Sequence, residues 1–68
     1  MNVTVNGEPR QVPAGATVAS VVELLEVTPG ARGVAVALDE EIVTRTAWAH
    51  TKLHDGARVE VVSAIQGG

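Results

Sequence analysis

Two histidines lie close enough in the sequence to form part of a metal site. His50 and His54 are four residues apart, and Asp55 follows directly. On a helix, this spacing would place both imidazoles on one face, as in some metal sites. The segment, however, lacks a helical stripe of apolar residues and offers no clear third ligand. We therefore interpret both histidines as solvent-facing residues near a loop, and we expect no metal.

Paired carboxylates are a second candidate for chemistry, because they can exchange protons with a substrate. Glu40 and Glu41 are adjacent, but neighbouring side chains on a turn diverge, and the sequence Asp-Glu-Glu is typical of a solvated hairpin tip. A phosphate-binding loop is not indicated either, because Gly15 is a single glycine ahead of the predicted helix. The side chains therefore predict no catalysis.

The chain ends in the sequence Ala64-Ile65-Gln66-Gly67-Gly68. Two final glycines indicate either a frayed terminus without meaning or a tail with a function. There is no cysteine in the chain, which excludes disulfides, cysteine-based zinc sites and a thiol nucleophile. The choice between the two interpretations depends on the elements that would hold this tail.

The composition predicts one small domain that is rich in strands. The chain has 68 residues, of which 46% are hydrophobic, and thirteen are valines. Valine is stiff at χ1 and packs better on a pleated sheet than in a helix. Trp48 is the single aromatic residue, and we interpret it as part of the core rather than as a stacking surface for a ligand.

The charge pattern argues against two classes of partner. The net charge is −3, and the five basic residues are spread singly along the chain, so we expect no nucleic-acid binding. No apolar stretch approaches the ~20 residues that span a bilayer, and the first residues lack a signal sequence. We therefore expect no membrane association and a cytoplasmic protein.

The periodicity of apolar residues predicts five strands and one helix. Asn6-Gly7 between two short strand-like runs indicates an antiparallel hairpin of residues 2–6 and 9–13. Thr17 is the expected N-cap of a helix that ends before Thr28, since Pro29 disfavours helical geometry in the residue before it. The apolar stripe of this helix consists of Val18, Val21, Val22 and Leu25.

The second half of the chain alternates again with the period of strands. Residues 33–38 predict a strand that is buried on one face and closely covered on the other, followed by a turn and a short strand at 41–43. Residues 45–53 indicate an irregular connection with one 3₁₀ turn. The last strand, 57–65, should place Val59 and Val61 inward.

This order, ββαβββ, is typical of the β-grasp arrangement, an α+β fold in which a mixed sheet of about five strands wraps one helix. The helix needs an apolar sheet face on which to bury its stripe. We expect a β-grasp, ubiquitin-like domain over residues 1–65 with the last strand in a central position. Residues 66–68 would then form a flexible C-terminal tail.

Several segments together resemble the ThiS family of thiamine-biosynthesis sulfur carriers. The resemblance runs nearly from end to end and includes the separated Arg45 and Trp48 and the terminal Gln-Gly-Gly. The segments that carry it are VNGE at 5–8, GATVASVVELL at 15–25, GVAVAL at 33–38, VTRTAW at 43–48, LHDGARVEVV at 53–62 and QGG at 66–68.

The resemblance implies a protein that serves as a co-substrate and is not itself an enzyme. An ATP-dependent adenylating enzyme would activate the carboxylate of Gly68, and a cysteine desulfurase system would supply sulfur to form a thiocarboxylate. Thiazole synthase would then use this sulfur. Gln66 and Gly67 would enter a narrow channel of the partner, since glycine lacks a Cβ. No cofactor would be bound, because ATP belongs to the activating partner.

Partners of such a carrier would also contact its folded part. The nearest apolar surface is expected on the outer sheet face around Val62, Ala64 and Ile65, although Val62 could equally complete the core. Two other functions stay open at this point. They are the small sulfur-carrier subunit of molybdopterin synthase and a ubiquitin-like modifier that is conjugated to lysines.

Overall fold

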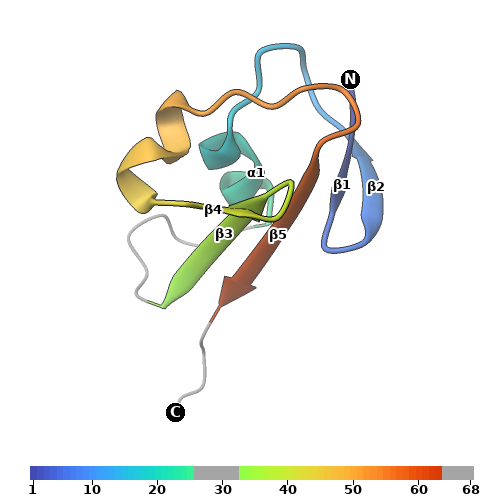
Figure 1. The fold of residues 1–68 in the computed structure, drawn as a ribbon. Helices are drawn as coiled ribbons and strands as arrows, with labels where there is room; N and C mark the ends of the chain where they lie inside the picture. The colour runs from blue at the N-terminus through green and yellow to red at the C-terminus, as the bar shows by residue number, and fades with distance from the viewer. Residues whose placement is uncertain (26–32, 64–68) are drawn as a thin grey trace.

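The computed structural model of the chain describes residues 1–25 and 33–63. One helix packs on one face of a five-stranded sheet whose strand order is β2-β1-β5-β3-β4 (Figure 1). β5 pairs in parallel with β1, whereas the other neighbours are antiparallel, so the sheet is mixed. This confirms the predicted β-grasp fold with its order ββαβββ and its central last strand. Among the described residues, no helix has the length and apolar character needed to cross a bilayer.

The first hairpin forms where the Asn-Gly pair predicts it. β1 (Asn2–Val5) and β2 (Glu8–Gln11) are antiparallel. Asn6 and Gly7 connect them with φ of 51° and 84°, respectively. Positive φ at both positions gives the tight turn the twist of the flanking strands.

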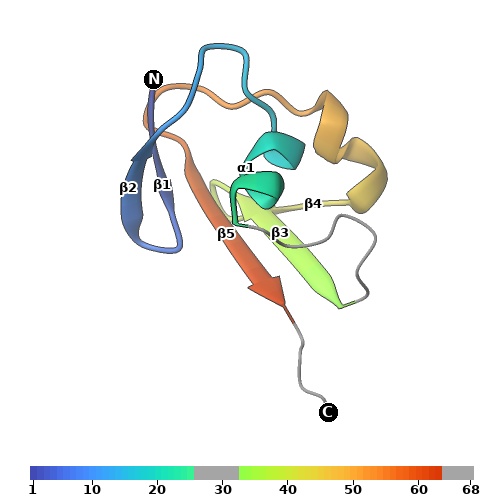
Figure 2. The ribbon, with the colours of Figure 1, turned by 180° about the vertical axis from the view of Figure 1, so that it is seen from behind.

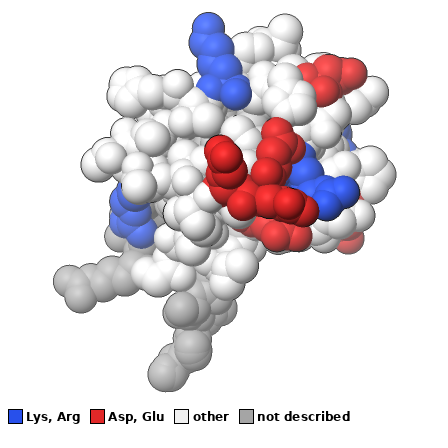
Figure 3. All heavy atoms as spheres, viewed as in Figure 1, with Lys and Arg blue, Asp and Glu red and all other residues white. Residues whose placement is uncertain are grey.

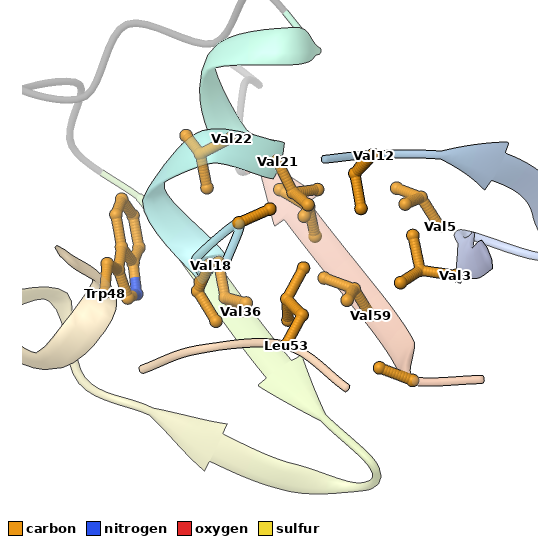
Figure 4. Packing of buried hydrophobic residues seen from close by; sticks show 13 residues of the cluster. Val3, Val5, Val12, Val18, Val21, Val22, Val36, Trp48, Leu53 and Val59 are labelled. Atoms are coloured by element: carbon orange, nitrogen blue, oxygen red, sulfur yellow. The ribbon is translucent and has the colours of Figure 1, made fainter. Parts of the chain in front are cut away.

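The helix α1 (Val18–Leu24) begins at the predicted cap. The side chain of Thr17 accepts a hydrogen bond from the Ser20 backbone N–H, and the Ser20 hydroxyl accepts one from the Thr17 N–H. These reciprocal bonds satisfy two backbone donors that the first turn of the helix leaves unpaired. α1 lies over one face of the sheet (Figure 2), and its valines face the sheet and are fully buried (Figure 4).

The hairpin of β3 (Val34–Leu38) and β4 (Glu41–Val43) confirms both predicted strands, but one expectation for β3 is wrong. Val36 is buried against α1, as expected, whereas Ala35 on the opposite face is exposed. The close cover expected on both faces is absent because α1 packs on one side of the sheet and no other described element covers the other. We call this uncovered side, opposite α1, the outer face.

The connection after β4 is the 3₁₀ helix η1 (Arg45–His50), which confirms the predicted 3₁₀ turn. Trp48 is 4% exposed and closes one end of the core, and its indole N–H donates to the Val43 carbonyl at 3.0 Å (Figure 4). Leu53 is also buried. β5 (Arg58–Ser63) follows, with Val59 and Val61 inward as expected.

Candidate functional site

β5 is the element that leads to the predicted reactive end of the chain. On one side it pairs with β1 through Thr4↔Arg58 and Val5↔Val59. On the other side it pairs with β3 along its whole length, from Leu38↔Val59 to Val34↔Ser63. Neighbours on both sides therefore fix the strand that precedes the final segment. The predicted site residues in that segment lie outside the described residues, namely Ala64, Ile65, Gln66, Gly67 and Gly68.

The side chain of Asn6 adds a second connection between β1 and β5. Its Oδ1 accepts a hydrogen bond from the Val61 N–H at 2.8 Å, and its Nδ2 donates to the Val61 carbonyl at 3.3 Å. The sequence analysis identified Asn6 only as a turn residue. The sequence did contain a signal for this contact. Glycine or aspartate would also tolerate positive φ, so asparagine at this position indicates that its side chain makes a contact beyond the turn.

The outer face carries a small group of apolar side chains, which we call the outer apolar patch. Val36 and Val61 face the core, so the residues that alternate with them face outward. Val62 is 63% exposed and Ile42 is 73% exposed. The patch consists of Ala35 and Ala37 on β3, Ile42 on β4 and Val62 on β5.

This geometry decides between the two interpretations of Val62, because the residue lies on the surface and not in the core. Ile42 was missed by the sequence analysis. The alternation of residues 41–43 was the signal, since it places Ile42 on the face opposite Val43. Ala64 and Ile65, the other two predicted docking residues, lie beyond the described part of β5.

Acidic side chains lie beside the patch, at the β3–β4 turn. Figure 3 shows them gathered on this side of the molecule, with a basic side chain next to them. Asp39 and Glu40 form the turn, both with positive φ, and the Glu40 carboxylate lies 4.0 Å from the Arg58 guanidinium. The outer face therefore combines an apolar area with an acidic margin.

His54 belongs to this acidic margin. Its Nε2 lies 2.7 Å from the Asp39 carboxylate, and its Nδ1 lies 2.9 Å from the Asp55 carbonyl. Both neighbours can only accept hydrogen bonds, so both ring nitrogens donate and the imidazolium form is favoured. The hydrogen bond to Asp39 is the largest cause that raises the pKa of His54, and the same bond lowers the pKa of Asp39.

The other candidates for side-chain chemistry are not assembled into a site. His50 is exposed in η1, while Glu40 and Glu41 are exposed at the hairpin tip. No group of three or more residues that could bind a metal ion is found within residues 1–25 and 33–63.

Comparison with known proteins identifies the family. The model of the ThiS family matches residues 3–68. The chain belongs to the ThiS family. This confirms the resemblance that the segments indicated, and the match includes the final residues, which the structure leaves undescribed.

Solved structures of this family have the same fold over the whole chain. The crystal structure of the thiamine biosynthesis protein (ThiS) from Geobacter metallireducens has a TM-score of 0.79 and 36% identity, with full coverage of both chains. A solution structure of a thiamine biosynthesis protein from the same organism has a TM-score of 0.78 and 36% identity. That match covers all of this chain and 88% of the other.

A curated relative places a ThiS-like segment within a longer protein. The thiazole synthase of Paramagnetospirillum magneticum is 37% identical over 68 residues. The match covers this whole chain but only 20% of that protein. The chain thus spans about a fifth of the length of this relative.

Proposed function

We propose that this chain carries sulfur on the carboxyl group of Gly68 for the synthesis of the thiazole part of thiamine. Membership of the ThiS family carries this proposal, because that family consists of small sulfur carriers and not of catalysts. The side chains are consistent with it, since the described residues form no group of three or more that could bind a metal ion. The reactive group would be the C-terminal carboxylate itself.

The chemistry requires an activating partner. A carboxylate is a poor electrophile, so one of its oxygens first attacks the α-phosphorus of ATP and releases pyrophosphate. In the resulting acyl-adenylate, AMP is a good leaving group, and the terminal sulfur of a persulfide from a cysteine desulfurase system displaces it. A thiol reductant then cleaves the S–S bond of this acyl disulfide, so that Gly68 carries a thiocarboxylate. ATP is bound by the adenylating, E1-like enzyme. Gln66 and Gly67 would lie in a channel of this enzyme, and the last two residues of the chain are glycines, which have no Cβ atom to obstruct a narrow channel.

The docking surface in this proposal is the outer apolar patch, together with the predicted docking residues Ala64 and Ile65, which lie outside the described residues. Exposure of Val62 and Ile42 on a sheet face that no described element covers supports this assignment. Val62 and Ile42 lie on β5 and β4, with Ala35 and Ala37 of β3 between these strands, so the four residues share one area of the outer face. Val62 lies on the strand that leads to Gly68, so one partner could contact both the patch and the final segment.

Thiazole synthase is the proposed acceptor of the sulfur. The support is that the thiazole synthase of Paramagnetospirillum magneticum contains a segment similar to this whole chain. Two domains that must bind each other repeatedly do so more readily when they are joined in one chain, because a short linker raises their effective concentration. We infer that this chain also binds a thiazole synthase, either as a separate protein or joined to it by a linker.

The direct test compares the intact chain with a chain that lacks Gly68. Removal of Gly68 sets the carboxylate back by about 3.3 Å along an extended chain. A displacement of ~1 Å can already reduce a rate by two orders of magnitude, so the shortened chain should not react. Both proteins are incubated with the activating enzyme, ATP and a sulfur source, and their intact masses are measured.

The intact chain should exchange one oxygen for one sulfur, and fragmentation should place the sulfur on Gly68. A reaction without ATP is the control for chemical sulfuration, and equal melting temperatures show that both chains are folded. Equal reaction of the shortened chain would overturn the proposal, as would sulfur on any residue before Gly67. An isopeptide bond to lysine instead of a thiocarboxylate would indicate a protein modifier.

A further inference from the structure

The Asn6 side chain continues the ladder between β1 and β5 after the backbone of β1 has turned away. The Thr4 N–H donates to the Ala57 carbonyl and the Asn6 N–H to the Val59 carbonyl, each at 2.9 Å. In a parallel ladder the next partner on β5 is two residues on, at Val61. The backbone carbonyl of Asn6 would be the regular acceptor, but φ of 51° at Asn6 begins the hairpin turn.

The carboxamide takes the place of the missing peptide group. Val61 N–H donates to Asn6 Oδ1 at 2.8 Å, and Asn6 Nδ2 donates to the Val61 carbonyl at 3.3 Å. A carboxamide has both an acceptor and a donor, whereas a carboxylate offers acceptors alone and glycine offers neither. The turn would accept asparagine, aspartate or glycine, so the contact with Val61 and not the turn requires asparagine.

We propose that Asn6 is a positioning residue for the C-terminal segment, a role that rests on the proposed sulfur-carrier function. It fixes the backbone of Val61, and Gly68 follows seven residues later, which corresponds to about 23 Å of extended chain. The direction of β5 at Val61 therefore sets where the final segment starts, and a displaced start would place the carboxylate of Gly68 farther from ATP in the docked complex. Without Asn6, β3 alone would hold β5 beyond Val59, through pairs up to Val34↔Ser63.

This role predicts a specific kinetic effect. Asn6 lies in the β1–β2 turn and outside the outer apolar patch, so its loss should leave docking unchanged. A less well-directed β5 would lower the fraction of docked complexes in which Gly68 reaches ATP. The effect should therefore appear in kcat for thiocarboxylation and not in KM.

The test uses Asn6→Gly, which keeps positive φ without strain and removes both hydrogen bonds to Val61. Hydrogen exchange comes first, and the Val61 amide should lose protection in this variant while the Val59 amide keeps it. In the activation reaction, kcat should fall about tenfold, and KM should stay within about twofold of the original value. Asn6→Asp keeps an acceptor for the Val61 N–H but loses the donor to the Val61 carbonyl. Its kcat should lie between that of the unmodified chain and that of Asn6→Gly.

Leu53→Val is the control for stability, because it removes a buried methylene group from a different segment and should leave kcat unchanged. An unchanged exchange rate of Val61 in Asn6→Gly would overturn the proposal. An unchanged kcat in that variant, or an equal loss in Leu53→Val, would do the same. Failure of the unmodified chain to react would count against the proposed function, and the exchange of Val61 would still decide whether Asn6 fixes β5.

Discussion

Asp39 connects two segments that are distant in the sequence through a single carboxylate. Its Oδ1 accepts from the Arg58 N–H at 3.0 Å and its Oδ2 accepts from His54 at 2.7 Å. Its own backbone N–H donates to the Arg58 carbonyl at 2.8 Å. The β3–β4 turn is thereby attached to the start of β5. Because the pair with His54 is exposed, its contribution to stability is small.

The pair between Asp39 and His54 should make stability depend on pH with a definite sign. Because the pKa of His54 is raised in the folded protein, the contribution of His54 to stability is fully present below its ordinary pKa of 6.5. The contribution is lost as pH rises through the raised value of the folded protein. Asp39 behaves oppositely, and its contribution is lost only as pH falls through its lowered pKa. The pair therefore stabilises most in weak acid.

His54→Gln tests this prediction. The melting temperature of the unmodified chain should exceed that of the variant by no more than a few degrees at about pH 6, and the difference should vanish at about pH 9. Thermal unfolding at both pH values measures it. His50→Gln, a change at an exposed histidine of η1, is the control and should show no such trend. A difference that grows with pH would contradict the assigned pair.

At the scale of elements, β5 separates two tasks by the two faces of one strand. Val59 and Val61 pack against α1 and stabilise the fold, while Val62 lies exposed on the outer face. Strand alternation ensures that neighbours face opposite sides, so a change at Val62 should affect contacts with partners more than the core.

Val62→Asp should therefore weaken docking while the fold stays intact. We expect KM for the activating enzyme to rise about tenfold, as for a residue in the centre of an interface. The free energy of unfolding should change by less than about 1 kcal/mol, the span of strand propensities. Kinetics and denaturant unfolding measure the two effects.

Leu24→Asp is the matched control for this change. Leu24 is a 50% exposed aliphatic residue on α1, on the opposite side of the sheet, and it receives the same charge. Its KM should equal that of the unmodified chain. A large loss of stability in Val62→Asp, or an equal rise of KM in both variants, would remove Val62 from the docking surface.

Local patterns explain why the sequence predicts the elements well. The Asn-Gly turn, the cap at Thr17 and the helix stripe are set by residues within a few positions of one another, and each is confirmed. Alternation also predicts that Val59 and Val61 face one side. It does not reveal which face is covered, and for this reason the close cover expected beside Ala35 was wrong and Val62 stayed undecided.

Contacts between distant segments are the part that the sequence does not predict. Asn6 and Val61 are 55 residues apart, and His54 and Asp39 are 15 apart. Each pair depends on strand order and register, which only the assembled sheet defines. The hydrogen bond from Trp48 to Val43 joins residues only 5 apart, yet its acceptor is not predictable either, although burial of the indole is predictable from its size.

At the scale of the whole molecule, the proposed function makes the fold a support for one reactive carboxyl group. A central strand with partners on both sides leads toward the final segment, and an apolar patch lies beside it on the outer face. Specific recognition would reside in the folded part, and the reaction in the last residue. This division would explain how a 68-residue chain could serve a synthesis whose steps other proteins catalyse.

The central claim is that sulfur on Gly68 becomes the sulfur of the thiazole ring. The most direct measurement uses this chain with a thiocarboxylate on Gly68 that contains radioactive sulfur. The labelled protein is incubated with thiazole synthase and its remaining substrates, and the thiazole product is isolated. The account predicts that the label appears in the thiazole and that the chain returns with an ordinary carboxylate. A thiazole without label, formed while the label stays on Gly68, would contradict it.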